Sequence, residues 1–134
     1  RLIGARPFLL DRMPVEWFEG SLDSEVEYLA GCDIGLMPLP DDPWTRGKGG
    51  YKLLQYGAVA LPVVASPVGV NSQIVAHGKT GFLADSDEAW SNHLLELIDD
   101  GELRDRMGSA GRQRMLERYS LEHSSHRIVN ILNE

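Results

Sequence analysis

The feature that most constrains the fold is a glycine- and lysine-rich segment, residues 46–56, followed closely by the apolar run 61–65. The segment is Arg-Gly-Lys-Gly-Gly-Tyr-Lys-Leu-Leu-Gln-Tyr, and the run is Leu-Pro-Val-Val-Ala. A short apolar run of this kind is typical of a strand buried on both faces of a parallel sheet. A helix over about 50–60 that leads into such a strand predicts an α/β architecture.

The same segment predicts an anion site at the start of the helix. Glycines let the backbone approach a ligand closely, and the first N–H groups of a helix have no partner inside it and lie at its positive end. Lys48 and Lys52 are four residues apart, and Gln55 is three further on, so they share one helix face or its approach. Lysine supplies a point charge for a phosphate, and an amide can bond a sugar hydroxyl. The alternative is a solvated turn before an amphipathic helix with surface lysines.

The charge distribution restricts the classes of partner. The net charge is −7, which argues against a general binder of nucleic acids or anionic membranes. Between Arg12 and Arg46 the chain has no lysine or arginine but eight carboxylates, so the cluster of positive charge at 46–52 stands out.

The single cysteine, Cys32, cannot form an internal disulfide and is expected to be a packed thiol. No apolar stretch is long enough for a membrane span, and we expect a cytoplasmic setting.

The remaining pattern alternates strands with helices and ends in helices alone. This alternation predicts a Rossmann-like parallel sheet with helices on both faces and a helical C-terminal tail packed on it. Ligands of such sheets bind at the carboxyl ends of the strands, here the loops after Gly20, Met37 and Ser66. Strands are expected at 1–4, 15–20, 33–39, 61–66 and 82–84, a loop at 40–45, and helices at 21–31, 50–60, 71–76, 87–99, 102–119 and 121–133.

Four motifs in order, residues 33–38, 52–56, 61–70 and 78–83, resemble the carboxyl-terminal domain of group 1 retaining glycosyltransferases of the GT-B type. The resemblance covers residues 1–134 as a single domain. It implies most of a nucleotide-sugar-binding domain, with the acceptor domain and the first units of this domain absent. The intact enzyme would transfer a sugar from a nucleotide-diphosphate sugar to a hydroxyl of a glycan, lipid or small molecule with retention, without cofactor or bound metal. The fragment alone is predicted to be inactive.

The resemblance also implies which residues meet the donor. Family members carry two glutamates eight residues apart, where this chain has Gly47 and Gln55. At the position of Gly57 they more often have a larger residue, and at the position of Ala60 they more often have glycine. A glycine inside a helix costs about 1 kcal/mol relative to alanine, so a close contact is expected at Gly57. No catalytic residue is identified. The expected donor contacts are Lys48, Gly49, Gly50, Tyr51, Lys52 and Gln55, with Gly20 and Ser21 touching the base.

Two other function classes remain open from the sequence. The departure at Gly47 is compatible with a non-catalytic nucleotide-binding or regulatory domain of the same fold. An unrelated flavodoxin-like signalling module would instead need an acidic pocket at its strand ends.

Several polar and aromatic residues are expected to have no direct role. His123 and His126 lack a third metal ligand. Trp44 is expected to plug its loop onto the body, Asp41 and Asp42 to be solvated, and His77 and His93 to lie on the surface. A basic helix face is expected to be solvated or to form a domain contact; it carries Arg104, Arg106, Arg112, Arg114 and Arg118.

Overall fold

The computed structural model describes residues 2–3, 14–18 and 24–133. Its centre is a parallel sheet of β3 (Gly35–Met37), β4 (Val63–Ala65) and β5 (Gly81–Leu83), in the order β3-β4-β5. Gly35 pairs with Val63, and Val63 with Gly81, so the strands are in parallel register. A separate parallel pair joins β1 (Leu2–Ile3) to β2 (Trp17–Phe18). The predicted parallel α/β sheet is confirmed.

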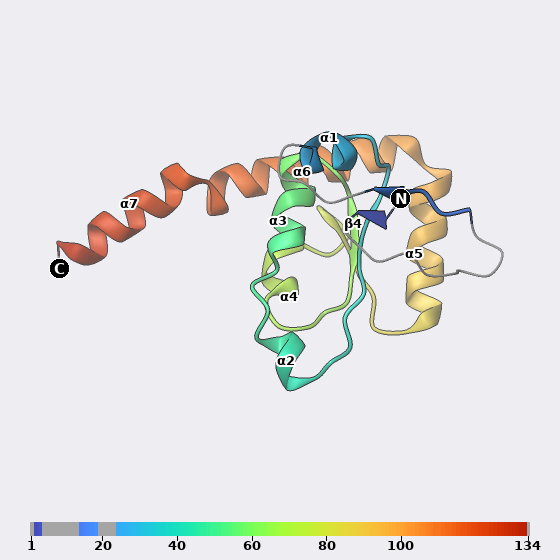
Figure 1. Cartoon of the computed structure of the whole chain (residues 1–134), viewed down its shortest axis with the longest axis horizontal. Helices are drawn as coiled ribbons and strands as arrows, with labels where there is room; N and C mark the ends of the chain where they lie inside the picture. Colours follow the sequence, from blue (N-terminus) through green and yellow to red (C-terminus); the bar gives the residue numbers. More distant parts are fainter. Residues whose placement is uncertain (1, 4–13, 19–23, 134) are drawn as a thin grey trace.

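Helices cover both faces of the sheet, as the sequence predicts. The helices are α1 (Glu25–Ala30), α2 (Pro43–Arg46), α3 (Tyr51–Ala58), α4 (Asn71–Ile74), α5 (Asp87–Asp99), α6 (Gly101–Tyr119) and α7 (Leu121–Leu132). Figure 1 shows α3 and α4 on one side of β4 and α5 on the other. Side chains alternate across β4: Val63 and Ala65 pack in a cluster with α3 and α4, whereas Val64 packs in a second cluster with α5.

Helix α6 joins the two layers. Met115 packs in the cluster of α3 and α4, while Met107 packs in the cluster of α5. Gly57 in α3 lies against Met115, where an added Cβ would clash with Met115 Cγ, so the close contact expected at Gly57 is confirmed. Gly108 lies equally close to the Ala60 carbonyl. Small residues therefore let α3 and α6 approach each other.

Arginines of α6 bind the carboxyl ends of three other helices. Arg104 Nη1 donates to the carbonyls of Leu97 and Ile98 near the end of α5, at 2.6 and 3.0 Å. Arg112 donates to the Ala58 carbonyl at the end of α3. Arg114 donates from Nε to Ile74 and from Nη2 to Gln73, at 2.8 and 2.7 Å, at the end of α4. The prediction of a solvated or domain-contact face is wrong for these three, because they neutralise the negative ends of helices and satisfy free carbonyls.

The last helix departs from the predicted packing. No residue of α7 is buried, and Leu121 and Leu132 are 85% and 79% exposed. Figure 1 shows α7 running away from the sheet. The expectation that the whole helical tail packs on the sheet is therefore wrong for α7, whereas α5 and α6 do pack on it. Within the described ranges, no helix is long and apolar enough to cross a membrane.

Candidate functional site

The opening of α3 lies at the ligand-binding edge of the sheet. The chain leaves the carboxyl end of β3, forms α2, and enters α3, which returns to the amino end of β4. Gly50 is the N-cap residue of α3, with φ of 66°, and its side-chain position is blocked by Ile74. Only glycine adopts this left-handed conformation without cost. The backbone conformation therefore requires glycine at position 50, and the contact of Gly50 with a donor stays a prediction.

Backbone donors are unused at this opening. The N–H groups of Gly49, Gly50, Tyr51 and Lys52 have no acceptor within the described part of the chain, whereas those of Lys48 and Leu53 bond to Thr45 and Gly50. Gly49 has open space around its Cα. Four successive free N–H groups at a helix start form a positive, anion-accepting surface.

Two lysines flank these donors. Lys48 and Lys52 are exposed, and neither forms a hydrogen bond or a salt bridge with a described residue. Lys48 also lowers the pKa of Asp42, as a minor cause, through its charge. The ammonium groups are not buried in carboxylate pairs and remain free for a ligand.

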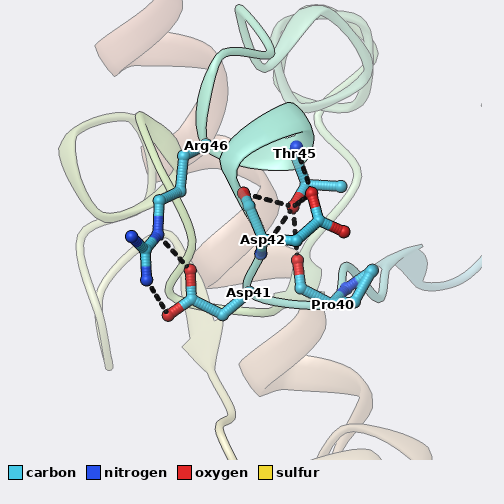
Figure 2. A network of polar contacts seen from close by, with 5 residues as sticks. All are labelled: Pro40, Asp41, Asp42, Thr45 and Arg46. Atoms are coloured by element: carbon cyan, nitrogen blue, oxygen red, sulfur yellow. Dashed lines mark hydrogen bonds and ion pairs between the residues drawn. The ribbon is translucent and has the colours of Figure 1, made fainter.

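The third cation of the segment is already engaged. Arg46 donates from Nε and Nη2 to the two carboxylate oxygens of Asp41, at 2.6 and 3.0 Å, as Figure 2 shows. This bidentate pair lowers the pKa of Asp41. Asp41 is exposed, as expected, but it also pairs with Arg46. The opening of α3 therefore has two lysines without a described partner rather than three free cations.

Asp42 begins a helix, α2, in a segment that was predicted to be a loop. Its side chain accepts a hydrogen bond from Thr45 N–H at 2.8 Å, and its own N–H donates to Thr45 Oγ1 at 3.2 Å, which together form a capping box. Figure 2 shows this network, in which the Thr45 hydroxyl also reaches the Pro40 carbonyl. Asp before Pro43, with Thr at the third helical position, is the signal that could have predicted α2. Asp42 is a helix cap, not a solvated loop residue.

The cap makes helix α2 sensitive to acid. Hydrogen bonds from the Thr45 backbone and then its hydroxyl hold the pKa of Asp42 below 3.8. The Asp42 carboxylate therefore stabilises the fold fully at pH values above 3.8, and this stabilisation is lost as the pH falls through the lowered pKa. Asp42→Asn keeps a capping side chain but cannot titrate. We expect the difference in Tm between wild type and Asp42→Asn to shrink as the pH is lowered from about 5 to about 2 in thermal melts. A difference that is constant across this range would contradict this account.

The other predicted site residues lie in different surroundings. Tyr51 is 66% exposed on the first turn of α3. Gln55 is half-buried and lines a groove of about 310 Å³ between α3 and α6, together with Tyr51, Arg112 and Tyr119. Gln55 therefore lies one turn along α3 from the lysines, at the rim of a separate groove. Gly20 and Ser21 lie outside the described residues.

A second concavity follows the carboxyl ends of all three strands of the sheet. This acidic cleft, of about 600 Å³, is lined by residues 38–41, 66–68, 84–87 and Trp90. Asp41, Asp85 and Asp87 give it a negative character, and neither Lys48 nor Lys52 lines it. An acidic pocket at the strand ends is the feature expected of a flavodoxin-like module.

Two aromatic predictions are corrected by the structure. Trp44 is 80% exposed on α2, so it does not plug its loop onto the body. His93 is half-buried and stacks on Phe82 with ring centroids 4.2 Å apart, so it is not a surface residue, whereas His77 is exposed. No group of three or more potential metal ligands occurs in the ranges that the structure covers.

Comparison with known proteins decides between the candidate families. Residues 16–114 match the family model of the glycosyl transferases group 1. The chain belongs to the group 1 glycosyltransferases. This membership excludes the flavodoxin-like rival, although the acidic cleft alone would have favoured it.

Related proteins include several bacterial glycosyltransferases. The chain is 33% identical over 125 residues to a GDP-mannose-dependent phosphatidylinositol monomannoside mannosyltransferase of Corynebacterium glutamicum, covering 86% of this chain and 32% of that protein. It is 36% identical over 113 residues to alpha-maltose-1-phosphate synthase of Mycolicibacterium smegmatis, covering 78% and 28%. The chain thus spans about a quarter to a third of the length of these relatives.

Solved structures show the same fold. Anabaena HepE in complex with UDP and glucose superposes with a TM-score of 0.73 at 20% identity, covering 88% of this chain and 31% of HepE. The C-terminal domain of a group 1 glycosyl transferase from Francisella tularensis gives a TM-score of 0.63 at 18% identity, covering 78% and 54%. The fold is that of the C-terminal domain of a GT-B glycosyltransferase, as the sequence predicts.

Proposed function

We propose that the chain is most of the donor-binding domain of a two-domain glycosyltransferase. The intact enzyme transfers a sugar from a nucleotide-diphosphate sugar to an acceptor hydroxyl, with retention and in the cytoplasm. Its acceptor is a glycan, a lipid or a small molecule held by a second domain. Supporting this, the chain spans only part of its relatives, and β3 pairs with no described strand on the side away from β4. A donor-binding domain alone would then be inactive, because the second domain holds the acceptor.

The observation that carries the proposal is the opening of α3. Four free backbone N–H groups, from Gly49 to Lys52, lie between two exposed and unpaired lysines at the carboxyl edge of a parallel sheet. A pyrophosphate supplies several negatively charged acceptors at close spacing, which matches this set of donors. The two relatives above, one solved with UDP and one dependent on GDP-mannose, are consistent with a nucleotide ligand.

The proposed chemistry assigns a part to each predicted contact. Lys48 and Lys52 offset the charge that builds on the departing nucleoside diphosphate. Gln55 bonds the ribose hydroxyls, and Gly20 and Ser21 touch the base. No cofactor or metal is required, because the two ammonium groups and the helix opening supply the positive charge.

The test is donor binding by a lysine variant of the intact protein. Lys52→Ala should weaken UDP and GDP binding about tenfold, since one charge-assisted contact contributes roughly 1.5–3 kcal/mol. Its Tm should be unchanged, because Lys52 is exposed and pairs with no described residue. Calorimetry with UDP and GDP measures the effect.

The matched control is Lys79→Ala. Lys79 is also exposed, but it precedes β5 and therefore lies toward the amino end of the sheet. It should bind both nucleotides like wild type. Unchanged affinity in Lys52→Ala, or an equal loss in Lys79→Ala, would reject the anion site.

A non-catalytic nucleotide-binding domain remains the second candidate because of Gly47. This residue ends α2 as its C-cap and offers no carboxylate at the position where family members carry the first glutamate. An intact protein that binds UDP or GDP but never transfers a sugar from any nucleotide sugar would favour this candidate.

A further inference from the structure

The loop between β4 and α4, residues 66–70, packs against the backbone that leads into α3. Gly69 has a φ of 57°, and a Cβ added to it would lie 2.7 Å from the Arg46 carbonyl oxygen. A Cβ added to Gly50, the N-cap of α3, would lie 3.1 Å from Val70 Cγ2. Because these contacts leave no free space, a shift of the loop would move the opening of α3 with it.

A buried amide, that of Asn71, closes this loop. Asn71 is 1% exposed, and its Nδ2 donates to the Ser66 carbonyl at 2.9 Å. Ser66 is itself held at the end of the sheet, because its N–H donates to the Met37 carbonyl at 3.1 Å and its Oγ accepts the Leu39 N–H at 2.9 Å. The Asn71 amide therefore ties the start of α4 to the carboxyl ends of β3 and β4.

The same side chain reaches the opening of α3. Asn71 Oδ1 lies 3.7 Å from the position that a Cβ on Gly50 would occupy. Burying an amide costs free energy unless the amide is hydrogen-bonded, so a position this deeply buried normally holds an apolar side chain. An apolar side chain could fill the space but could not bond the Ser66 carbonyl. The hydrogen bond across the loop therefore explains why an amide occupies this position.

We propose that Asn71 is a positioning residue for the opening of α3. Its hydrogen bond to Ser66 holds the β4–α4 loop against Arg46 and Gly50. The supported backbone keeps the free N–H groups of residues 49–52 directed at one ligand. Asn71 acts through this backbone and does not touch the ligand. The inference rests on the proposed function, because those N–H groups form the proposed pyrophosphate site.

Limited trypsin digestion of the intact protein tests the positioning without any ligand. Trypsin cuts after Lys48 and Lys52 when the opening of α3 unfolds locally. Cutting after Arg106 requires more extensive unfolding, because α6 packs in both core clusters. Asn71→Ala removes the hydrogen bond to Ser66. Cleavage after the two lysines should therefore rise about tenfold relative to cleavage after Arg106, as measured by mass spectrometry.

Nucleotide binding connects the positioning to the proposed site. Calorimetry with UDP and GDP, at a temperature where the variant is fully folded, should give Asn71→Ala a Kd about tenfold higher than that of wild type. Leu97→Ala is the matched control, because Leu97 is also fully buried but packs between α5 and the sheet. It should lower the Tm at least as much, yet leave the cleavage ratio and the nucleotide Kd unchanged. A role of Asn71 in stability alone would make the two variants behave alike.

A conservative variant keeps the test valid if Asn71→Ala does not fold. In Asn71→Ser the hydroxyl can still donate to the Ser66 carbonyl, although from a shorter side chain. The cleavage ratio and the nucleotide Kd should therefore both change by about threefold, less than in Asn71→Ala.

Three outcomes would overturn the proposal. The first is a wild-type cleavage ratio in both Asn71 variants, and the second is a loss of nucleotide affinity that Leu97→Ala reproduces. The third is an unchanged nucleotide Kd in the Asn71 variants when the wild type binds. A wild type that binds neither UDP nor GDP would instead reject the proposed function, and the trypsin pattern alone would then decide whether Asn71 holds the opening.

Discussion

Replacing Gly108 with alanine should destabilise the chain by about 2–4 kcal/mol, although alanine is the better helix former by about 1 kcal/mol. A Cβ at residue 108 would overlap the carbonyl oxygen of Ala60 and lie 2.9 Å from its carbon. Both are backbone atoms in the turn between α3 and β4, so no side-chain rotation can relieve the clash. The helices α3 and α6 would have to move apart.

Urea unfolding followed by circular dichroism measures this loss. Gly101→Ala is the matched control, because a Cβ there meets Arg104 Nη2 at 3.5 Å, an ordinary contact. It should leave stability within about 1 kcal/mol of wild type. Equal unfolding midpoints for Gly108→Ala and wild type would show that the packing of α6 against Ala60 is not as close as described.

Leu97→Ala should cost about 2–5 kcal/mol, the range for large-to-small changes in a closed core. Leu97 is fully buried and packs with Val64, Phe82 and Met107 between α5 and the sheet. Its removal opens a cavity in the cluster that α5, α6 and β4 share.

The same substitution at Leu95 provides the control for Leu97. Leu95 lies on the same helix but is 57% exposed, so Leu95→Ala should change stability by less than about 1 kcal/mol. The comparison removes the effect of helix propensity, which is identical at both positions. A cost at Leu97 no larger than at Leu95 would contradict the assigned core.

Apart from α2, the sequence predicted every strand and helix that the structure describes, because hydrophobic periodicity is strong and burial follows it. Val63, Val64 and Ala65 are all at most 4% exposed, as a strand covered on both faces requires. Helix α2 was missed because two prolines and two aspartates suggest a loop, whereas Asp42 and Thr45 form a cap. The exposure of Trp44 and α7 depends on tertiary contacts, which periodicity does not report.

At the candidate site, features formed by residues close in the sequence were predicted, whereas contacts between distant segments were not. The helix start at Gly50 followed from glycine and lysine spacing, and the structure adds the free N–H groups. The pairing of Arg46 with Asp41 was not predictable, since it depends on how α2 turns. Ala60 has a φ of 57°, which explains why relatives are expected to prefer glycine there. The acidic cleft draws on three distant loops, so no single stretch could reveal it.

The arginines of α6 have a consequence for synthesis on the ribosome. The carbonyl ends of α3, α4 and α5 are all translated before Arg104, Arg112 and Arg114, which later bind them. Until those residues are synthesised, the carbonyl groups at three helix ends lack these arginine donors. In a nascent chain, residues 25–100 should therefore stay protease-sensitive until α6 has been synthesised.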